Sequence, residues 1–201
     1  ALKTVGLCTA MGLSGLHIPA DEPSEIPLVP AIFSDIGDEQ SLDESLSTFS
    51  GHLANLQLIL DRLEPGTLVL LDELVVGTDP LQGAALAQAI LERFADREAL
   101  TVVTTHYENL KVLPFEDARF RNGAMGFDAD SGQPSYSLAF DVPGASSALR
   151  TARRLGLDAA IVDRAVELAG PEQRALQRVI EDLERERDAL RKHREKAEAE
   201  A

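Results

Sequence analysis

Two acidic residues and one histidine stand at the ends of two apolar runs, and their types suggest phosphate chemistry. The segment TLVLLDE, residues 67–73, is a continuous apolar run that closes with Asp72 and Glu73. A second apolar run, residues 101–105, is followed directly by His106. One carboxylate can organise a magnesium ion through water, and a second can orient or deprotonate an attacking water. The alternative is that both acids merely end a strand and are solvated.

A strand, a helix and a second strand would position these side chains. Residues 67–71 have the pattern of a parallel strand that is buried on both faces. Pro80 suits the first turn of a helix, which we expect to run to about Arg97. Residues 101–105 then form a second buried strand that ends at His106. The expected inward-facing residues of the helix are Leu86, Ala89, Ile90 and Phe94.

This strand–helix–strand spacing is typical of a crossover unit, whose two strands are parallel. Ligands of open parallel sheets bind just outside the carboxyl ends of the strands. We therefore expect Asp72, Glu73 and His106 to converge where a phosphate would sit. Between the two strands lies Gly77-Thr78-Asp79-Pro80, a tight turn that could reach across a subunit boundary.

A helix is predicted upstream, over residues 47–63. Its apolar residues recur every three or four positions and so share one helical face, and Ser47 is a natural N-cap. The helix opens with LSTFSG, whose backbone amides and hydroxyls could receive an anion. An ordinary capped helix would show the same pattern. The expected apolar face comprises Phe49, Leu53, Leu56, Leu60 and Leu63.

The remaining elements before residue 170 are shorter. Residues 2–16 indicate a helix rich in small residues, and residues 26–36 indicate short strands at a sheet edge, since prolines interrupt them. Residues 118–128 and 134–140 are typical of a β-hairpin with Asp-Ser-Gly in its turn. Two short helices follow.

The composition changes near Pro171, after which the chain holds almost nothing except Ala, Leu, Glu, Arg and Lys. We therefore divide the chain into a domain at 1–170 and a helical arm or linker at 171–201. Leu176, Leu183 and Leu190 stand seven apart, which is the spacing of a coiled-coil seam. A lone amphipathic helix is the alternative.

Charge and composition exclude several classes of function. The formal net charge of −15 argues against this chain as the main DNA-gripping surface, because DNA affinity depends largely on Lys and Arg. No apolar run approaches the roughly 20 residues of a membrane-spanning helix, so we expect no membrane insertion. A single cysteine and the lack of a leader pattern favour a cytoplasmic location.

The remaining histidines suggest no metal centre. His17, His52 and His193 show no metal-ligand spacing with Cys8 or with one another. Surface or capping roles are expected for them.

Four segments together resemble a known family. They are DIGDEQSLDESLSTFSGH, TLVLLDELVVGTDPLQGAALAQAIL, TVVTTHYENLK and YSLAFDVPGASSA. In this order and spacing they resemble the second type of bacterial MutS paralogue, many members of which carry a Smr nuclease domain. The DELxxGTDP pattern separates this branch from mismatch-repair MutS. The resemblance implies an α/β fold of the P-loop NTPase class, ABC-type and MutS-like, with a mainly parallel sheet and a coiled-coil-like C-terminal helix.

The resemblance implies roles for the residues already singled out. Asp72 and Glu73 would be the Walker B magnesium and catalytic carboxylates, and His106 the switch histidine that senses the γ-phosphate. The family usually shows Gly-Ala after the leucine equivalent to Leu74, whereas this chain has Val75-Val76. Two β-branched residues would stiffen that turn.

Further nucleotide-binding residues are implied at a subunit boundary. Ser47 and Thr48 fall in the signature segment that acts on the nucleotide of the opposite protomer. Thr78 and Asp79 would form the subunit-crossing loop, and Gln40 the glutamine near magnesium.

The phosphate-binding loop GxxxxGK[ST] does not occur in these 201 residues. In the family this loop comes immediately before a segment similar to ALKTVGL. We therefore expect the sheet to be incomplete at its N-terminal side, and the chain by itself to bind ATP poorly and to be inactive.

The function implied for the complete protein is that of a DNA-linked ATPase, a homodimer around ATP and Mg²⁺. It would bind branched DNA through regions outside this chain and suppress recombination. Stalled ribosomes are a further implied target, and endonuclease activity would come from a Smr domain outside these residues. Two alternatives remain. One is a non-catalytic dimerisation module. The other is an ABC- or SMC-type ATPase outside the MutS group, which the STFSG segment in place of an LSGGQ-like signature disfavours.

Overall fold

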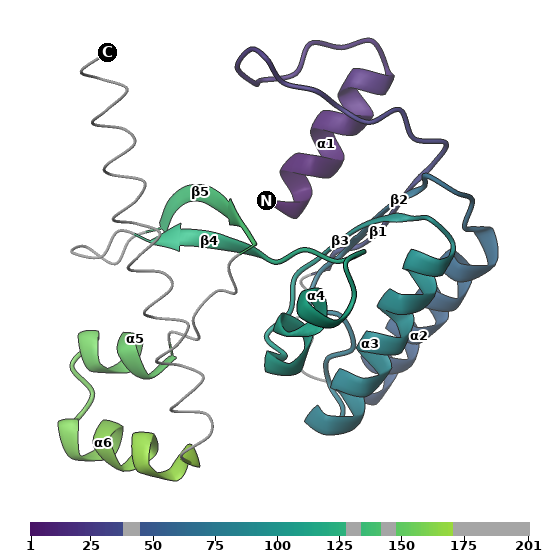
Figure 1. Cartoon of the computed structure of the whole chain (residues 1–201). Helices are drawn as coiled ribbons and strands as arrows, with labels where there is room; N and C mark the ends of the chain where they lie inside the picture. Colours follow the sequence, from purple (N-terminus) through teal and green to yellow (C-terminus); the bar gives the residue numbers. More distant parts are fainter. Residues whose placement is uncertain (38–44, 128–133, 142–147, 171–201) are drawn as a thin grey trace, which may run out of the picture. The chain divides into compact units, whose positions relative to one another are not determined.

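Four stretches of the chain are described by the computed structural model, namely residues 1–37, 45–127, 134–141 and 148–170 (Figure 1). The chain divides into two units, with the boundary between Leu110 and Lys111. Nothing in the sequence pattern pointed to this boundary. The predicted boundary near Pro171 stays a prediction, because the arm at 171–201 lies outside the described residues.

A small parallel sheet is the centre of the first unit, with the strand order β1-β2-β3. Its register pairs Asp35 with Leu71, and Leu71 with Val103. The three strands therefore end at the same edge. Figure 1 shows α2 and α3 on one face of the sheet and α1 on the other. The elements are α1 (Leu2–Leu13), β1 (Ile32–Asp35), α2 (Ser45–Arg62), β2 (Leu68–Leu71), α3 (Pro80–Asp96) and β3 (Leu100–Val103).

The central strand β2 is buried along its whole length, which confirms the sequence expectation. On one face, Leu68 and Leu70 pack with Leu2 of α1. Close approach of α1 depends on Gly6, because a Cβ there would lie 2.6 Å from Leu70 Cδ1. Each fully buried leucine contributes about 1.5–3 kcal/mol, so β2 is a rigid base for the residues that follow it.

The strand β3 differs from the expectation of a buried strand that reaches residue 105. It ends at Val103, and its residues alternate between exposed and half-buried. Leu100 and Val102 are 46% and 38% exposed. They are register neighbours of Leu68 and Leu70 on the face that α1 covers, and α1 packs over β2. The apolar run thus predicted that a strand forms, but it did not predict that no helix among the described residues buries Leu100 and Val102.

The helix α3 starts at Pro80 as predicted, and its N-cap is Asp79, whose side chain accepts a hydrogen bond from the Gln82 amide. Ile90 and Phe94 are buried as expected, but Leu86 is 38% exposed and Ala89 is also exposed. The buried face of the helix instead includes small residues, which pack against the rest of the unit as the larger apolar ones do. The buried set is Gly83, Ala84, Ala87, Ile90, Leu91 and Phe94.

The helix α2 begins at Ser45, so Ser47 lies inside its first turn and is not the predicted N-cap. Leu56 and Leu63 are buried as expected. Ile59, which the predicted face omitted, is only 1% exposed. The other three members of the predicted face, Phe49, Leu53 and Leu60, are half-buried.

The second unit contains the predicted hairpin and the two predicted short helices. The strands pair antiparallel, from Gly123 opposite Phe140 to Phe127 opposite Pro134. The first strand begins at Gly123 rather than near residue 118, and the predicted turn lies outside the described residues. The elements are α4 (Leu113–Glu116), β4 (Gly123–Phe127), β5 (Pro134–Phe140), α5 (Ala148–Arg154) and α6 (Ala159–Leu168), and the 3-10 turn η1 (Glu108–Lys111) lies at the unit boundary.

In the part of the chain that the structure describes, none of the helices has the length and apolar character needed to cross a membrane.

Candidate functional site

The carboxyl edge of the parallel sheet brings Asp72 and Thr104 side by side. The backbone pairing continues one residue beyond the strands, because the Asp72 amide donates to the Asp35 carbonyl at 2.9 Å. In the same way, the Thr104 amide donates to the Leu71 carbonyl at 3.0 Å. Asp72 and Thr104 therefore occupy equivalent positions just past β2 and β3, whereas the sequence pattern placed the end of the second strand at His106.

The Thr104 hydroxyl ties both acidic residues to the next strand. It donates a hydrogen bond to Asp72 Oδ1 and accepts one from the Glu73 amide at 3.0 Å. The Asp72 carboxylate is thereby oriented, while Glu73 is exposed and adopts a left-handed backbone with φ 49°. Thr104 lies in the run at 101–105, and its residue type alone indicated no role for it. The Thr-Thr pair before His106 was the signal.

A second polar group lies at the end of β1. The Asp35 carboxylate accepts a hydrogen bond from Asn55 Nδ2 at 2.9 Å and contacts His52 Nδ1 at 2.8 Å. Both partners belong to α2, so the contacts fasten this helix to the strand end beside Asp72. His52 had been expected at the surface or in a cap, but its side chain is only 21% exposed. The sequence gave no sign of this contact, because its partner Asp35 lies 17 residues earlier in the chain.

The loop that follows Glu73 is folded back into the protein. Leu74 and Val75 are each only 3% exposed. Val75 and Gly77 have left-handed backbones, with φ 61° and 84°. A Cβ at Gly77 would lie 4.0 Å from Phe49 Cβ. The loop therefore lies against the first turns of α2, which include the LSTFSG segment.

The end of β3 contacts the same loop through Tyr107. Its hydroxyl donates to the Val75 carbonyl at 2.6 Å, and its ring is tilted by 40° against the His106 ring, with centroids 4.7 Å apart. Burial, and then the nearby Asp79 carboxylate, raise the pKa of Tyr107 above its usual 10.0. The phenol therefore keeps its proton at neutral pH and remains a donor.

The structure describes the side chains of some of the predicted site residues but not of others. Asp72 is half-buried, whereas Glu73, Thr78, Asp79 and His106 are exposed. The backbone of Ser47 and Thr48 lies in the first turn of α2, but their side chains lie outside what is described, as does Gln40 altogether.

The donors present fit a magnesium ion that is shared with a ligand. Among the described residues, no cluster of three or more His, Cys, Asp or Glu side chains could hold a metal ion. Mg²⁺ commonly keeps several waters and is bound by one or two carboxylates together with substrate phosphates. An oriented Asp72 beside an exposed Glu73 is such a donor set.

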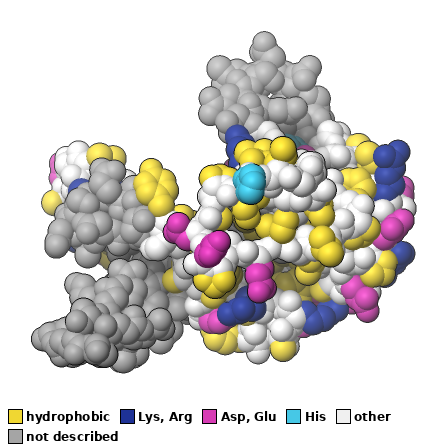
Figure 2. Space-filling view, turned by 90° about the horizontal axis from the view of Figure 1, so that it is seen from above, with side chains coloured by type: hydrophobic (Ala, Val, Ile, Leu, Met, Phe, Trp, Pro, Cys, Tyr) yellow, Lys and Arg dark blue, Asp and Glu magenta, His cyan; other side chains and the backbone are white. Residues whose placement is uncertain are grey.

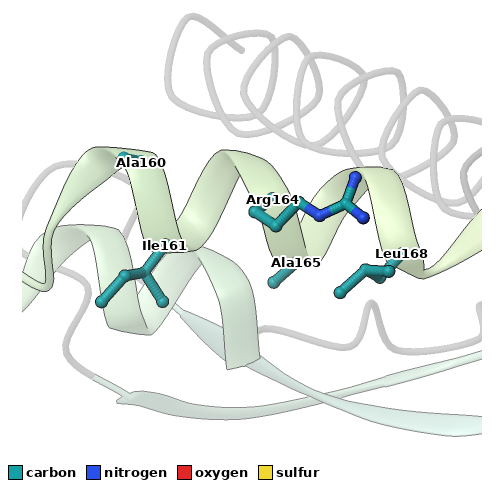
Figure 3. Close-up of a pocket in the computed structure, with 5 residues that line it drawn as sticks. All are labelled: Ala160, Ile161, Arg164, Ala165 and Leu168. Atoms are coloured by element: carbon teal, nitrogen blue, oxygen red, sulfur yellow. The ribbon is translucent and has the colours of Figure 1, made fainter.

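A shallow apolar hollow on α6 is not a competing site (Figure 3). Among the described residues of its lining, the one charged residue is Arg164, which pairs with Glu167 at 2.7 Å. These described lining residues include no nucleophile and no acid–base pair. Its lining residues are Ala160, Ile161, Arg164, Ala165 and Leu168.

Comparison with known proteins assigns the chain to a family. The family model described as MutS domain V matches residues 1–171. The chain belongs to the MutS domain V family. The match spans the sheet with Asp72 and Glu73, the loop after them and the hairpin, so all the elements described above are parts of domain V.

Relatives named Endonuclease MutS2 confirm the resemblance to the second type of MutS paralogue. The protein from Symbiobacterium thermophilum is 47% identical over 192 residues, which cover 96% of this chain and 24% of that protein. The Lacticaseibacillus casei protein is 47% identical over 188 residues, 94% of this chain and 24% of its own length. The Finegoldia magna protein is 46% identical over 183 residues, with coverages of 91% and 23%. The chain thus spans about a quarter of these relatives.

Proposed function

We propose that this chain forms the Walker B side of an ABC-type, P-loop ATPase site in a MutS2-like protein. The observation that carries the proposal is the Thr104 hydroxyl, which holds the Asp72 carboxylate and the Glu73 amide at the carboxyl edge of a parallel sheet. Ligands of such sheets bind at this edge. The family and the relatives' names support an ATPase at the family level.

ATP and Mg²⁺ are the proposed ligands. Asp72 holds the magnesium ion through water, and the ion neutralises charge on the transferred phosphate. Glu73 projects into solvent just beyond Asp72, where it orients and deprotonates the attacking water. His106 senses the γ-phosphate from the end of the neighbouring strand. Gln40 is proposed as a further residue near magnesium.

The complete site is proposed to form between two copies of the protein. Ser47 and Thr48 act on the nucleotide of the opposite protomer, and Thr78 with Asp79 forms the loop that crosses the boundary. The approach of Gly77 to Phe49 supports this arrangement, because it places the loop and the start of α2 next to each other. Both segments then belong to one surface that a second copy can meet.

DNA is the proposed partner of the complete protein through regions outside this chain. The net charge of −15 favours DNA binding by other regions, because DNA affinity depends largely on Lys and Arg. On the face shown in Figure 2, basic side chains are scattered among acidic and hydrophobic ones rather than gathered in a patch. We propose branched DNA as the substrate, suppression of recombination as the role, rescue of stalled ribosomes as a further role, a cytoplasmic location, and endonuclease activity in a Smr domain.

The phosphate-binding loop is proposed to come from residues other than these 201, since none of them forms GxxxxGK[ST].

A second candidate function is a non-catalytic dimerisation module. The apolar hollow on α6 favours it, because Ile161 and Leu168 in its lining are exposed, and exposed apolar surface is typical of contact surfaces. The predicted coiled-coil arm would extend such a surface.

Replacement of Glu73 by Gln in the complete protein separates the two functions. The substitution keeps the size of the side chain but removes the base, so ATP hydrolysis falls by about a hundredfold or more, while ATP-dependent dimerisation persists. The control is Glu64→Gln, which alters an exposed acid at the opposite end of β2. Hydrolysis at the unaltered rate in Glu73→Gln would falsify the proposal that this chain forms the Walker B side of the ATPase site, and would favour the dimerisation module for the chain.

A further inference from the structure

Tyr107 is a buried aromatic residue just beyond β3, and its hydroxyl donates a hydrogen bond to a carbonyl of the loop after Glu73. Tyr107 is 7% exposed, and its hydroxyl lies 2.6 Å from the Val75 oxygen, across a sequence separation of 32 residues. A buried carbonyl without a partner costs about 1–3 kcal/mol. The loop after Glu73 therefore depends on Tyr107 to satisfy its backbone.

Space for this hydroxyl exists because residue 83 is a glycine. A Cβ at Gly83 would lie 2.4 Å from the Tyr107 hydroxyl and 3.1 Å from both the Val75 oxygen and Thr78 Cγ2. Gly83 is in the first turn of α3, where it costs helix stability relative to alanine. The first turn of α3, the loop and the end of β3 thus meet at one point.

The backbone at Val75 needs such a restraint. Val75 has φ 61°, in the left-handed region that β-branched residues rarely adopt. Such a conformation persists only where its surroundings hold it. Its side chain is 3% exposed, and its carbonyl is bound by Tyr107. Both contacts hold the turn that leads to Thr78 and Asp79.

Tyr107 also touches the residue proposed to sense the phosphate. It follows His106 directly in the chain, and the two rings are 4.7 Å apart. Its amide is held by the Thr105 hydroxyl at 3.0 Å. A displacement of His106 therefore moves a side chain whose other end is bound to the loop.

We propose that Tyr107 is a positioning residue that couples His106 at the end of β3 to the loop carrying Thr78 and Asp79. This inference rests on the proposed function and adds to it a path from the nucleotide to the dimer surface. When His106 responds to the γ-phosphate, the Tyr107 hydroxyl carries that response to Val75 and so sets the position of the loop. Tyr107 contacts neither the nucleotide nor the water.

Tyr107→Phe in the complete protein tests the coupling, because it removes the hydroxyl and keeps the ring. The control is Tyr136→Phe, which alters the chain's other tyrosine, 83% exposed on β5. In Tyr107→Phe we expect kcat and ATP-dependent dimerisation to fall by about three- to tenfold, the effect of one hydrogen bond. KM for ATP stays unchanged, because Tyr107 does not bind ATP. A purely structural role would lower thermal stability and leave kcat and dimerisation as they are.

Hydrogen exchange of the amides of residues 76–79 gives a direct reading of the loop. In the unaltered protein, ATP slows this exchange, and in Tyr107→Phe the difference between the ATP-bound and ATP-free states shrinks. Gly83→Ala, whose new Cβ displaces the hydroxyl, has the same effect on exchange and on dimerisation. Adding Tyr107→Phe to Gly83→Ala relieves part of the clash, so the two substitutions are less than additive in the unfolding midpoint.

The failure of the coupling and the failure of the ATPase proposal give different results. Normal kcat, dimerisation and loop exchange in Tyr107→Phe overturn the coupling, provided that Glu73→Gln still abolishes hydrolysis. If Glu73→Gln leaves hydrolysis intact, the ATPase proposal fails and the coupling fails with it.

Discussion

The carboxyl edge of the parallel sheet and the ion pairs of the second unit use polar groups in opposite ways. At the sheet edge, the hydrogen bonds of Thr104 and Asp35 flank the fully buried strand β2, and those of Asp35 are half-buried while those of Thr104 are exposed. In the second unit, Arg121 pairs with Asp141 at 2.6 Å, but both side chains are 63% exposed. Solvent screens exposed pairs, so they contribute little to stability.

The difference shows where a polar contact can position a reacting group. A hydroxyl fixed by a rigid strand orients its partner, whereas an exposed arginine and aspartate on a hairpin orient only each other. Substitutions at both kinds of contact test this contrast.

Thr104→Val should have the largest effect, because it removes two hydrogen bonds at once from the sheet edge. The Asp72 carboxylate loses its orientation and the Glu73 amide loses its acceptor. We expect the free energy of unfolding to fall by about 1–3 kcal/mol. In the complete protein, ATP hydrolysis should fall by about tenfold or more, since misplaced groups lose catalysis steeply. Steady-state kinetics and urea unfolding measure both effects, and unaltered hydrolysis would show that Thr104 does not position Asp72.

Asp35→Ala should come next, because it leaves His52 and Asn55 without their half-buried acceptor. We expect a loss of about 1–3 kcal/mol in urea unfolding. The matched control is Asp61→Ala on α2, which removes an exposed hydrogen bond to Gln57 and should cost less than about 0.5 kcal/mol. Equal losses in the two variants would contradict the view that burial makes the Asp35 contacts stronger.

Thr101→Val should have a small effect of the opposite sign. Thr101 lies on β3, three residues before Thr104, but its buried hydroxyl makes no hydrogen bond among the described residues. Replacing an unsatisfied hydroxyl by a methyl group is neutral or stabilising, by up to about 1 kcal/mol. A marked loss of stability in this variant would mean that the hydroxyl has a partner after all.

The smallest effect should come from acid titration of the exposed pairs. The hydrogen bond from Arg121 lowers the pKa of Asp141 below its ordinary 3.8, and Arg119 does the same to Asp117. A carboxyl whose pKa is lowered by folding adds stability above its unfolded pKa and loses it as the pH falls through the folded value. Asp141→Asn should therefore lower the unfolding midpoint slightly at neutral pH, and its difference from the unaltered protein should disappear as the pH falls through the folded pKa of Asp141.

Local patterns were enough to predict most of the elements near the candidate site. The unbroken apolar run before Asp72 predicted a strand buried on both faces, and β2 is such a strand. Asp79-Pro80 predicted the start of α3 because a capping side chain and a proline act within one turn. These effects are local, so the order of the residues carries them.

Helix rotation and strand cover were predicted less well. Leu86 was expected inward and is exposed, since Gly83 and Ala87 take the buried face. Val102 was expected to be buried and is 38% exposed. Both depend on which neighbouring element packs against the residue, and an apolar side chain does not encode that neighbour.

By itself, the sequence determined the family, the strand that leads into Asp72 and Glu73, and the helix that Asp79 caps. Only the tertiary structure decided that Thr104 orients Asp72, that His52 contacts Asp35, and that Tyr107 reaches Val75. These contacts join residues 17 to 32 positions apart. They exist because strand register and helix packing bring distant backbone segments together, whereas the effects that a sequence pattern displays act within a few residues of each other.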